Sequence, residues 1–171
     1  MAVAVVLIAL TGMWVYAFFF ADRHNPDVFP DRAWAERADA VCERYVAQVD
    51  ALPSARSFRD IEPKSLALAQ RADVADQVTE ILRQMVAELQ SVPPADELSI
   101  TGVRLWYDDW QLHLVDRDRH TYSWRAGVDE PFAETAVRGR EVGKGVPVTI
   151  RMDNFAEING MPSCSAPRDI G

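Results

Sequence analysis

The sequence of 171 residues contains no recognisable catalytic or cofactor-binding motif. No serine or cysteine lies in a G-x-S-x-G or similar nucleophile setting, and no pair of carboxylates is distinguished from the other acidic residues. The glycine-rich stretch with Gly139, Gly143 and Gly145 matches neither the GxGxxG nor the GxxxxGK[ST] pattern of phosphate-binding loops. These absences predict a protein that is not an enzyme and has no cofactor.

The chain also lacks a basic stripe, a run of like charges, an internal repeat and a low-complexity tract. Its formal net charge is -8 and its pI is about 4.8. An acidic balance of this kind does not attract polyanions, so nucleic acid is not an expected partner. After the first apolar segment, about 150 residues remain, which is enough for one domain with its own core.

Charged side chains are absent from residues 1–21, which are almost wholly apolar from Ala2 onward. At ~1.5 Å per residue, a helix of this length covers ~30 Å, the hydrocarbon thickness of a bilayer. A cleaved signal peptide is the alternative, but it needs a basic start, a shorter apolar core and a small residue where Phe19 stands. The segment therefore predicts an uncleaved anchor in the lipid bilayer, followed by a Pro-containing tether over residues 22–30.

The chain has two cysteines, Cys42 near the start of the predicted domain and Cys164 near the end of the sequence. This placement suits a disulfide that closes the domain in an oxidising compartment, and two unrelated buried thiols are the alternative. No CxxC pair is present and no histidine lies beside either cysteine, so a zinc or redox site is not expected. The charges near the span do not decide its orientation. A disulfide forms in an oxidising compartment, so the cysteines favour an extracytoplasmic domain at the cell membrane.

Apolar residues recur at helical spacing over most of the remaining chain. Asp31 is a plausible N-cap, Pro53 and Pro93 end two of the stretches, and Gly127 is suited to terminate a third. The sequence predicts an all-α fold, in which residues 31–171 form a four-helix-type bundle. The predicted helices cover residues 31–52, 64–91, 99–125 and 146–159, with a short irregular or hairpin segment at 130–145 before the last helix.

Asp109, His113, Asp116 and His120 form one polar stripe on the third predicted helix, because steps of four and three residues keep side chains on one helical face. Aspartate and neutral histidine are metal ligands, so these four residues are weak candidates for a metal or acid–base site. The two histidines lie ~10.5 Å apart along the axis, too far for one ion unless a neighbouring helix contributes. Asp-to-His contacts between residues four apart are the simpler interpretation, and no metal is predicted.

Trp106, Trp110 and Trp124 are nearly aligned on the same predicted helix. Such an aromatic stripe can present a platform to a protein partner or a ligand, and it can also belong to the core. The sequence therefore makes these three residues a possible partner surface and leaves the core interpretation open beside it.

Several short segments of the predicted domain occur together with the leading apolar span. They are Arg32-Ala33-Trp34-Ala35 opening a helix that contains Cys42, Trp110 followed by Asp116-Arg117, and a closing Phe155-Ala156-Glu157-Ile158-Asn159-Gly160-Met161-Pro162-Ser163-Cys164. This arrangement resembles single-pass membrane proteins of high-GC Gram-positive (actinobacterial) type with an extracytoplasmic helical domain. The resemblance implies the same topology and a paired Cys42 and Cys164, and it implies no activity.

An anchor, a short tether and long amphipathic helices together favour a membrane-anchored helical interaction domain. The expected role is that of an accessory or scaffolding protein, with a membrane or cell-envelope protein as its partner. The competing hypothesis is an extracytoplasmic ligand-binding or sensory module, in which a pocket between helices holds a small molecule or a metal.

Overall fold

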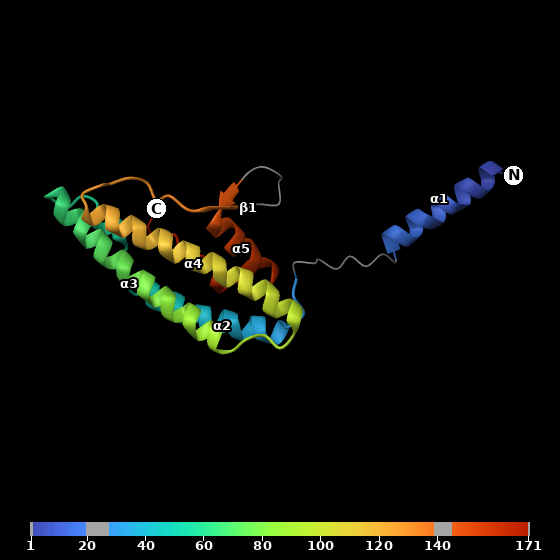
Figure 1. Cartoon of the computed structure of the whole chain (residues 1–171), viewed down its shortest axis with the longest axis horizontal. Helices are drawn as coiled ribbons and strands as arrows, with labels where there is room; N and C mark the ends of the chain where they lie inside the picture. The colour runs from blue at the N-terminus through green and yellow to red at the C-terminus, as the bar shows by residue number, and fades with distance from the viewer. Residues whose placement is uncertain (1, 20–27, 139–144, 171) are drawn as a thin grey trace.

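The computed structural model describes residues 2–19, 28–138 and 145–170. After the first helix, the described elements form one helical body (Figure 1), which confirms the predicted all-α bundle. In chain order these elements are α2 (Arg32–Asp50), η1 (Ala55–Phe58), α3 (Lys64–Ser91), α4 (Glu97–Arg125), β1 (Ala136–Arg138), β2 (Gly145–Pro147), α5 (Val148–Ile158) and η2 (Pro162–Cys164).

The first helix, α1 (Ala2–Phe19), stands apart from this body in Figure 1. It has 18 residues. Among the residues that the structure describes, no helix is both long enough and apolar enough to cross a membrane. The prediction of a membrane anchor over residues 1–21 is therefore wrong, and so is the single-pass localisation that depended on it.

The helix α2 begins where the sequence predicts. The side chain of Asp31 accepts a hydrogen bond from the backbone N–H of Trp34 at 2.9 Å, which satisfies one of the free donors of the first turn. The indole of Trp34 is buried and donates to the backbone carbonyl of Val92 at 2.6 Å. This bond ties the start of α2 to the end of α3.

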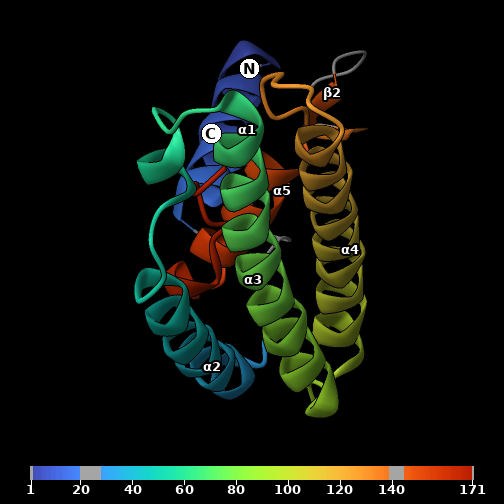
Figure 2. The ribbon, with the colours of Figure 1, turned by 90° about the vertical axis from the view of Figure 1, so that its left-hand side faces the viewer.

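The two longest helices, α3 and α4, run side by side in opposite directions, as Figure 2 shows. Pro93 and Pro94 stop α3, because proline has no N–H and its ring clashes with a preceding helical turn. The side chain of Asp96 then caps α4 by accepting from the N–H of Ser99 at 2.9 Å. The helix therefore starts two residues earlier than predicted, and Gly127 ends it with a positive φ of 83°.

The segment between α4 and α5 contains a short antiparallel hairpin. Strands β1 and β2 pair with Val137 opposite Val146, so the hairpin alternative for residues 130–145 is confirmed; its connection, residues 139–144, lies outside the described part. Helix α5 follows β2 directly and packs along α4 with Val148 and Met152 buried. At its C-terminal end Gly160 has a φ of 73°, a left-handed conformation that residues with a side chain rarely adopt.

Phe29 belongs to the helical body, although the sequence places it in an extended tether. Its side chain is 5% exposed, and its ring lies 5.7 Å from Trp34 and 5.8 Å from Phe155, measured between ring centroids. Its backbone N–H donates to the buried side chain of Asn159 at 3.0 Å. The domain therefore begins before residue 31, and the remaining predicted tether, residues 22–27, lies outside the described residues.

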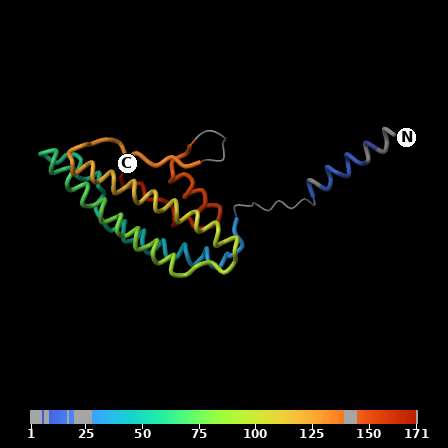
Figure 3. Tube along the Cα trace, viewed as in Figure 1, coloured from blue at the N-terminus to red at the C-terminus, as the bar shows by residue number. Residues whose placement is uncertain are grey.

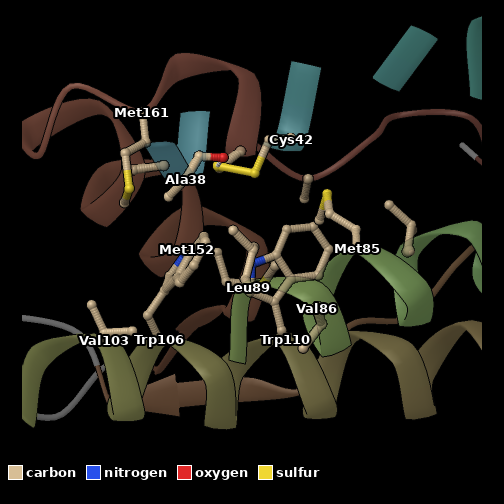
Figure 4. Close-up of a cluster of buried hydrophobic side chains, with 14 of the residues drawn as sticks. Ala38, Cys42, Met85, Val86, Leu89, Val103, Trp106, Trp110, Met152 and Met161 are labelled. Atoms are coloured by element: carbon tan, nitrogen blue, oxygen red, sulfur yellow. Dashed lines mark hydrogen bonds between the residues drawn. A yellow bond between two sulfur atoms is a disulfide. The ribbon is translucent and has the colours of Figure 1, made fainter. Parts of the chain in front are cut away.

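The main core lies between α2, α3, α4 and α5. Figure 4 shows Cys42, Met85, Trp110 and Met152 among the side chains of this core. Cys42 of α2 is joined to Cys164 of η2 by a disulfide that spans 122 positions of the sequence. The predicted pairing is confirmed, and both sulfurs are fully buried.

Beyond the disulfide, the chain runs back along the bundle to the position marked C in Figure 3. Its Ile170 packs in a second, smaller apolar cluster with Leu68, Ala72 and Trp124. The carboxylate of Asp169 receives two hydrogen bonds of 2.7 Å from the buried guanidinium of Arg117. The last described residues are therefore held by contacts with both long helices.

Candidate functional site

Helix α4 positions all seven residues that the sequence singles out on it: Trp106, Asp109, Trp110, His113, Asp116, His120 and Trp124. All of them lie on the inward side of the helix and are buried. The outer side of α4 faces solvent. The inner and outer surfaces of this one helix are therefore separate candidates for function.

The two aspartates of the predicted polar stripe pair with arginines and not with histidines. Asp109 receives hydrogen bonds from two nitrogens of Arg151 on α5. Asp116 accepts from the hydroxyl of Thr135 at 2.8 Å and pairs with Arg119 one turn along α4. The predicted Asp-to-His contacts are wrong, because arginine provides donors that a neutral histidine cannot match.

The two histidines are surrounded by aromatic rings. His113 lies 6.0 Å from Trp110 and 6.1 Å from Phe132, and His120 lies 4.3 Å from Trp124 and 5.3 Å from Phe132, all between ring centroids. Phe132 comes from the segment after α4 and is placed between the two histidines. These rings therefore fix that segment against the inner side of α4 by apolar contact.

Burial, followed by the positive charge of Arg117, lowers the pKa of His113 to about 4. Nearby Glu134, Asp169 and Asp116 oppose this shift only in part. Burial and then Arg71 also lower the pKa of His120. Neither ring nitrogen of His113 has a hydrogen-bond partner within the described part of the chain. Both histidines are thus neutral at pH 7, and they act as core side chains in this fold.

No group of three or more histidine, cysteine or carboxylate side chains that could hold a metal ion occurs among residues 2–19, 28–138 and 145–170. The candidates Asp109, His113, Asp116 and His120 are not brought together, because each contacts different neighbours on α5, the hairpin segment or the aromatic cluster. The inner side of α4 therefore presents ion pairs and packed rings in place of a ligand-binding centre.

Trp106, Trp110 and Trp124 are 2%, 0% and 1% exposed. Trp106 stacks on Phe155 of α5 with 5.6 Å between ring centroids, and Arg71 of α3 lies 4.1 Å from the ring centroid of Trp124. The structure agrees with the core interpretation of these rings. They are not accessible to a partner, so the alternative prediction that they form a partner surface is wrong.

The outer side of α4 carries an apolar surface that the sequence analysis missed. We call it the α4 seam. It consists of Leu98 (75% exposed), Leu105 (57%), Leu112 (36%), Val115 (57%) and Tyr122 (75%). The signal was present as a seven-residue repeat, but the more numerous apolar residues of the inner side obscured it. A long row of exposed apolar side chains on one helix is a recognised mark of an interaction surface.

A groove of about 470 Å³ lies between α2, α3 and the C-terminal tail. Leu82, Met85 and Val46 are among the apolar residues that line it, and Glu43 and Asp50 are acidic residues of the same lining. Pro162 and Ser163 of the closing segment line the groove, whereas none of the seven residues singled out on α4 does. The charged lining also includes Asp169 and Arg168, so acidic side chains outnumber the one basic side chain in a groove that is otherwise largely apolar.

Comparisons with protein-family models, with curated proteins and with solved structures find no match for this chain. Its class therefore rests on its own fold and surfaces. The fold and the surfaces define a disulfide-linked helical bundle with an exposed apolar seam on its longest helix.

Replacing His113 with leucine is expected to remove part of the acid sensitivity of the fold. Below pH ~6.5 the unfolded chain binds a proton at this histidine, whereas the folded chain does so only near pH 4. Folding stability is therefore lost as the pH falls through this window, by about 2–3 kcal/mol at pH 4.5 for this residue. Urea unfolding of the wild type and His113→Leu at pH 7 and pH 4.5 measures the difference.

The carboxylates are present in both the wild type and the variant. The difference between the two proteins in stability lost on acidification therefore isolates the contribution of His113. At pH 7, His113→Leu should be neutral or slightly stabilising, because leucine leaves no polar atom unpaired in the core. Equal losses of stability on acidification in the two proteins would show that His113 does not bind its proton differently in the folded and unfolded states.

Proposed function

We propose that this chain is a non-catalytic helical interaction domain that acts as an accessory or scaffolding component of a protein assembly. Its partner docks on the α4 seam. The observation that carries the proposal is the row of exposed apolar side chains from Leu98 to Tyr122 on the outer side of α4. Their burial against a partner would contribute about 25 cal/mol per Å² of apolar surface.

A rigid support for the seam favours this role. Arg117 links α4 to Thr79 of α3 at 2.9 Å and to Asp169 of the tail, while Arg151 of α5 pairs with Asp109. These contacts fix α4 from three sides. A helix held in this way presents its outer surface without a cost in chain ordering when a partner binds.

The non-catalytic part of the proposal is supported by the use of the titratable groups on α4. Asp109 and Asp116 are engaged by arginines, and His113 is packed among rings with its pKa far below 7. A general acid or base needs access to a substrate and a pKa near the working pH. These side chains instead stabilise the bundle.

A second candidate is a ligand-binding module, favoured by the groove between α2, α3 and the tail. Its apolar lining, and the excess of carboxylates such as Glu43 and Asp50 over its one basic residue, Arg168, favour a small apolar cation. A thermal shift with an alkylammonium ion, absent with the alkyl sulfate of equal length and reduced in Glu43→Gln, would support it. An equal response to both ions would exclude the charge-selective site.

The proposed function is tested by site-specific photo-crosslinking in the cells from which the chain comes. A photo-reactive amino acid at Leu105 or Val115 is expected to form a covalent adduct with one and the same protein, identified by mass spectrometry. The matched control is Leu66 of α3, which is 44% exposed but lies outside the seam. No adduct at either seam position, or the same adducts at Leu66, would refute docking on the seam.

A further inference from the structure

The α4 seam follows the spacing by which helices pair. Leu98, Leu105 and Leu112 are seven residues apart, and Val115 and Tyr122 continue the pattern three residues after Leu112 with the same spacing. Alternating steps of three and four residues place knobs of one helix in the holes of another. The seam is therefore shaped for a second helix that lies along α4 for about 36 Å.

The seam is complementary to itself in the antiparallel direction. With a two-fold axis between Asp108 and Leu112, Leu98 lies opposite Tyr122 of a second copy, and Leu105 lies opposite its Val115. By symmetry the same two contacts form again on the other side of the axis. Both halves of the paired helices then bury apolar side chains that are solvent-exposed in the single chain.

Charged residues beside the seam match in the same arrangement. One flank of the seam carries exposed residues seven apart, namely Glu97, Arg104, Gln111, Asp118 and Arg125. Antiparallel pairing brings Glu97 near Arg125 of the second copy and Arg104 near its Asp118, while Gln111 meets its own counterpart at the axis. Each charged residue of this flank therefore faces the opposite charge.

Parallel pairing does not have this complementarity. It would bring the charged flank against the other flank of the seam, where Asp109 and Asp116 already pair with Arg151 and Arg119 of their own chain. Those two aspartates are buried and directed inward. On the first flank, Asp118 also pairs with Arg83, and Arg125 also pairs with Asp73, within their own chain. These side chains nevertheless remain about half exposed, unlike Asp109 and Asp116, so this flank is accessible to a second copy and matches it in the antiparallel direction.

From the seam and its flank we infer that the partner on α4 is a second copy of this chain, in an antiparallel homodimer. This inference rests on the proposed function, because it names the occupant of the same surface. Thr101, Asp108 and Arg119 interrupt the apolar contacts along the seam. Polar residues at such positions fix the register and lower the affinity, so the dimer is in reversible exchange with the monomer.

The inference is tested first by charge reversal, with the full chain studied by sedimentation at several concentrations. Arg104→Glu and Asp118→Arg should each weaken dimerisation at least about tenfold, since each places like charges together at two symmetric positions. The double variant should restore it to within about threefold of the wild type, as interacting pairs do in a double-mutant cycle. Leu66→Ser, outside the seam, should leave it unchanged.

A disulfide-trapping experiment tests the direction of pairing. Both native cysteines are joined to each other, so Gln111→Cys introduces a free thiol at the axis and should give a covalent dimer under mild oxidation. Leu98→Cys should not, because the two copies of this position lie about 36 Å apart in the antiparallel arrangement. Trapping at Leu98→Cys but not at Gln111→Cys would overturn the inference in favour of a parallel pair.

Two further results would overturn the inference. One is a chain that remains monomeric at all concentrations. The other is association that none of the α4 variants changes, which would place the contact elsewhere, for example on the exposed side chains of Trp14 and Phe18 in α1. If photo-crosslinking at Leu105 still captures a different protein, the proposed function survives and only the identity of its partner fails.

Discussion

Replacing both Cys42 and Cys164 with alanine is expected to lower the free energy of unfolding by about 5 kcal/mol. The disulfide closes a loop of 122 positions, and in the chain-entropy model the stabilisation grows with the logarithm of the loop length. A loss of this size is comparable with the total stability of many domains. Urea unfolding followed by far-UV circular dichroism measures it.

The reduced wild type provides the matched control for this prediction. It keeps both sulfur atoms in the core, whereas the alanine variant also loses their packing. Reduction alone should therefore account for most of the loss, and the variant should be slightly less stable than the reduced protein. An unchanged unfolding midpoint on reduction would show that the tail and η2 are held without the disulfide.

Replacing Asp169 with alanine is expected to destabilise the fold by about 3–5 kcal/mol, because it leaves the charge of Arg117 buried and unpaired. Arg117 is 0% exposed, and its guanidinium donates two bonds of 2.7 Å to Asp169 and one of 2.9 Å to Thr79. The tail would then lose its ion pair with α4 and would be held by the packing of Ile170. Thermal and urea unfolding of Asp169→Ala measure the effect.

The chain offers an exposed ion pair as a control for this experiment. Asp73 lies 2.7 Å from Arg125, and both side chains are largely in solvent. Asp73→Ala should cost less than about 1 kcal/mol, as surface pairs do. The double variant Arg117→Met with Asp169→Leu should recover much of the lost stability, because it removes the buried charge together with its partner. Equal effects of the two aspartate substitutions would contradict the assigned role of Arg117.

These two predictions concern the frame that supports the α4 seam. The disulfide fixes η2 against α2, and Arg117 holds α4 against α3 and the tail. Variants that lack the disulfide or the Arg117–Asp169 pair should therefore bind the partner of the seam less well, since ordering α4 on binding would then cost free energy. The seam variants themselves replace exposed side chains and should leave the free energy of unfolding nearly unchanged.

Local sequence signals predicted the helices well. The bounds of α3, Lys64–Ser91, agree with the predicted stretch, because its ends are set by Pro63 and by the prolines at 93 and 94. Asp31 and Gly127 also act at the predicted ends of α2 and α4. Caps and breakers act within one helical turn, so no tertiary information is needed to read them.

The candidate site could not be predicted in the same way. The spacing of Asp109, His113, Asp116 and His120 indicates a common face, but it does not indicate which residues of other elements meet that face. Arg151 lies 42 positions from Asp109, and Thr135 lies 19 positions from Asp116. These partners outcompete the histidines four residues away, because they supply charge-assisted or directed hydrogen bonds.

The sequence by itself determined the helical class, the bounds of most helices, the pairing of the two cysteines as its leading alternative, and the absence of recognisable catalytic motifs. Only the tertiary structure decided that the tryptophans of α4 face inward, that Phe29 belongs to the core, and that the seam from Leu98 to Tyr122 faces outward. The reason is that periodicity assigns residues to faces of a helix, whereas packing against distant segments decides which face is buried.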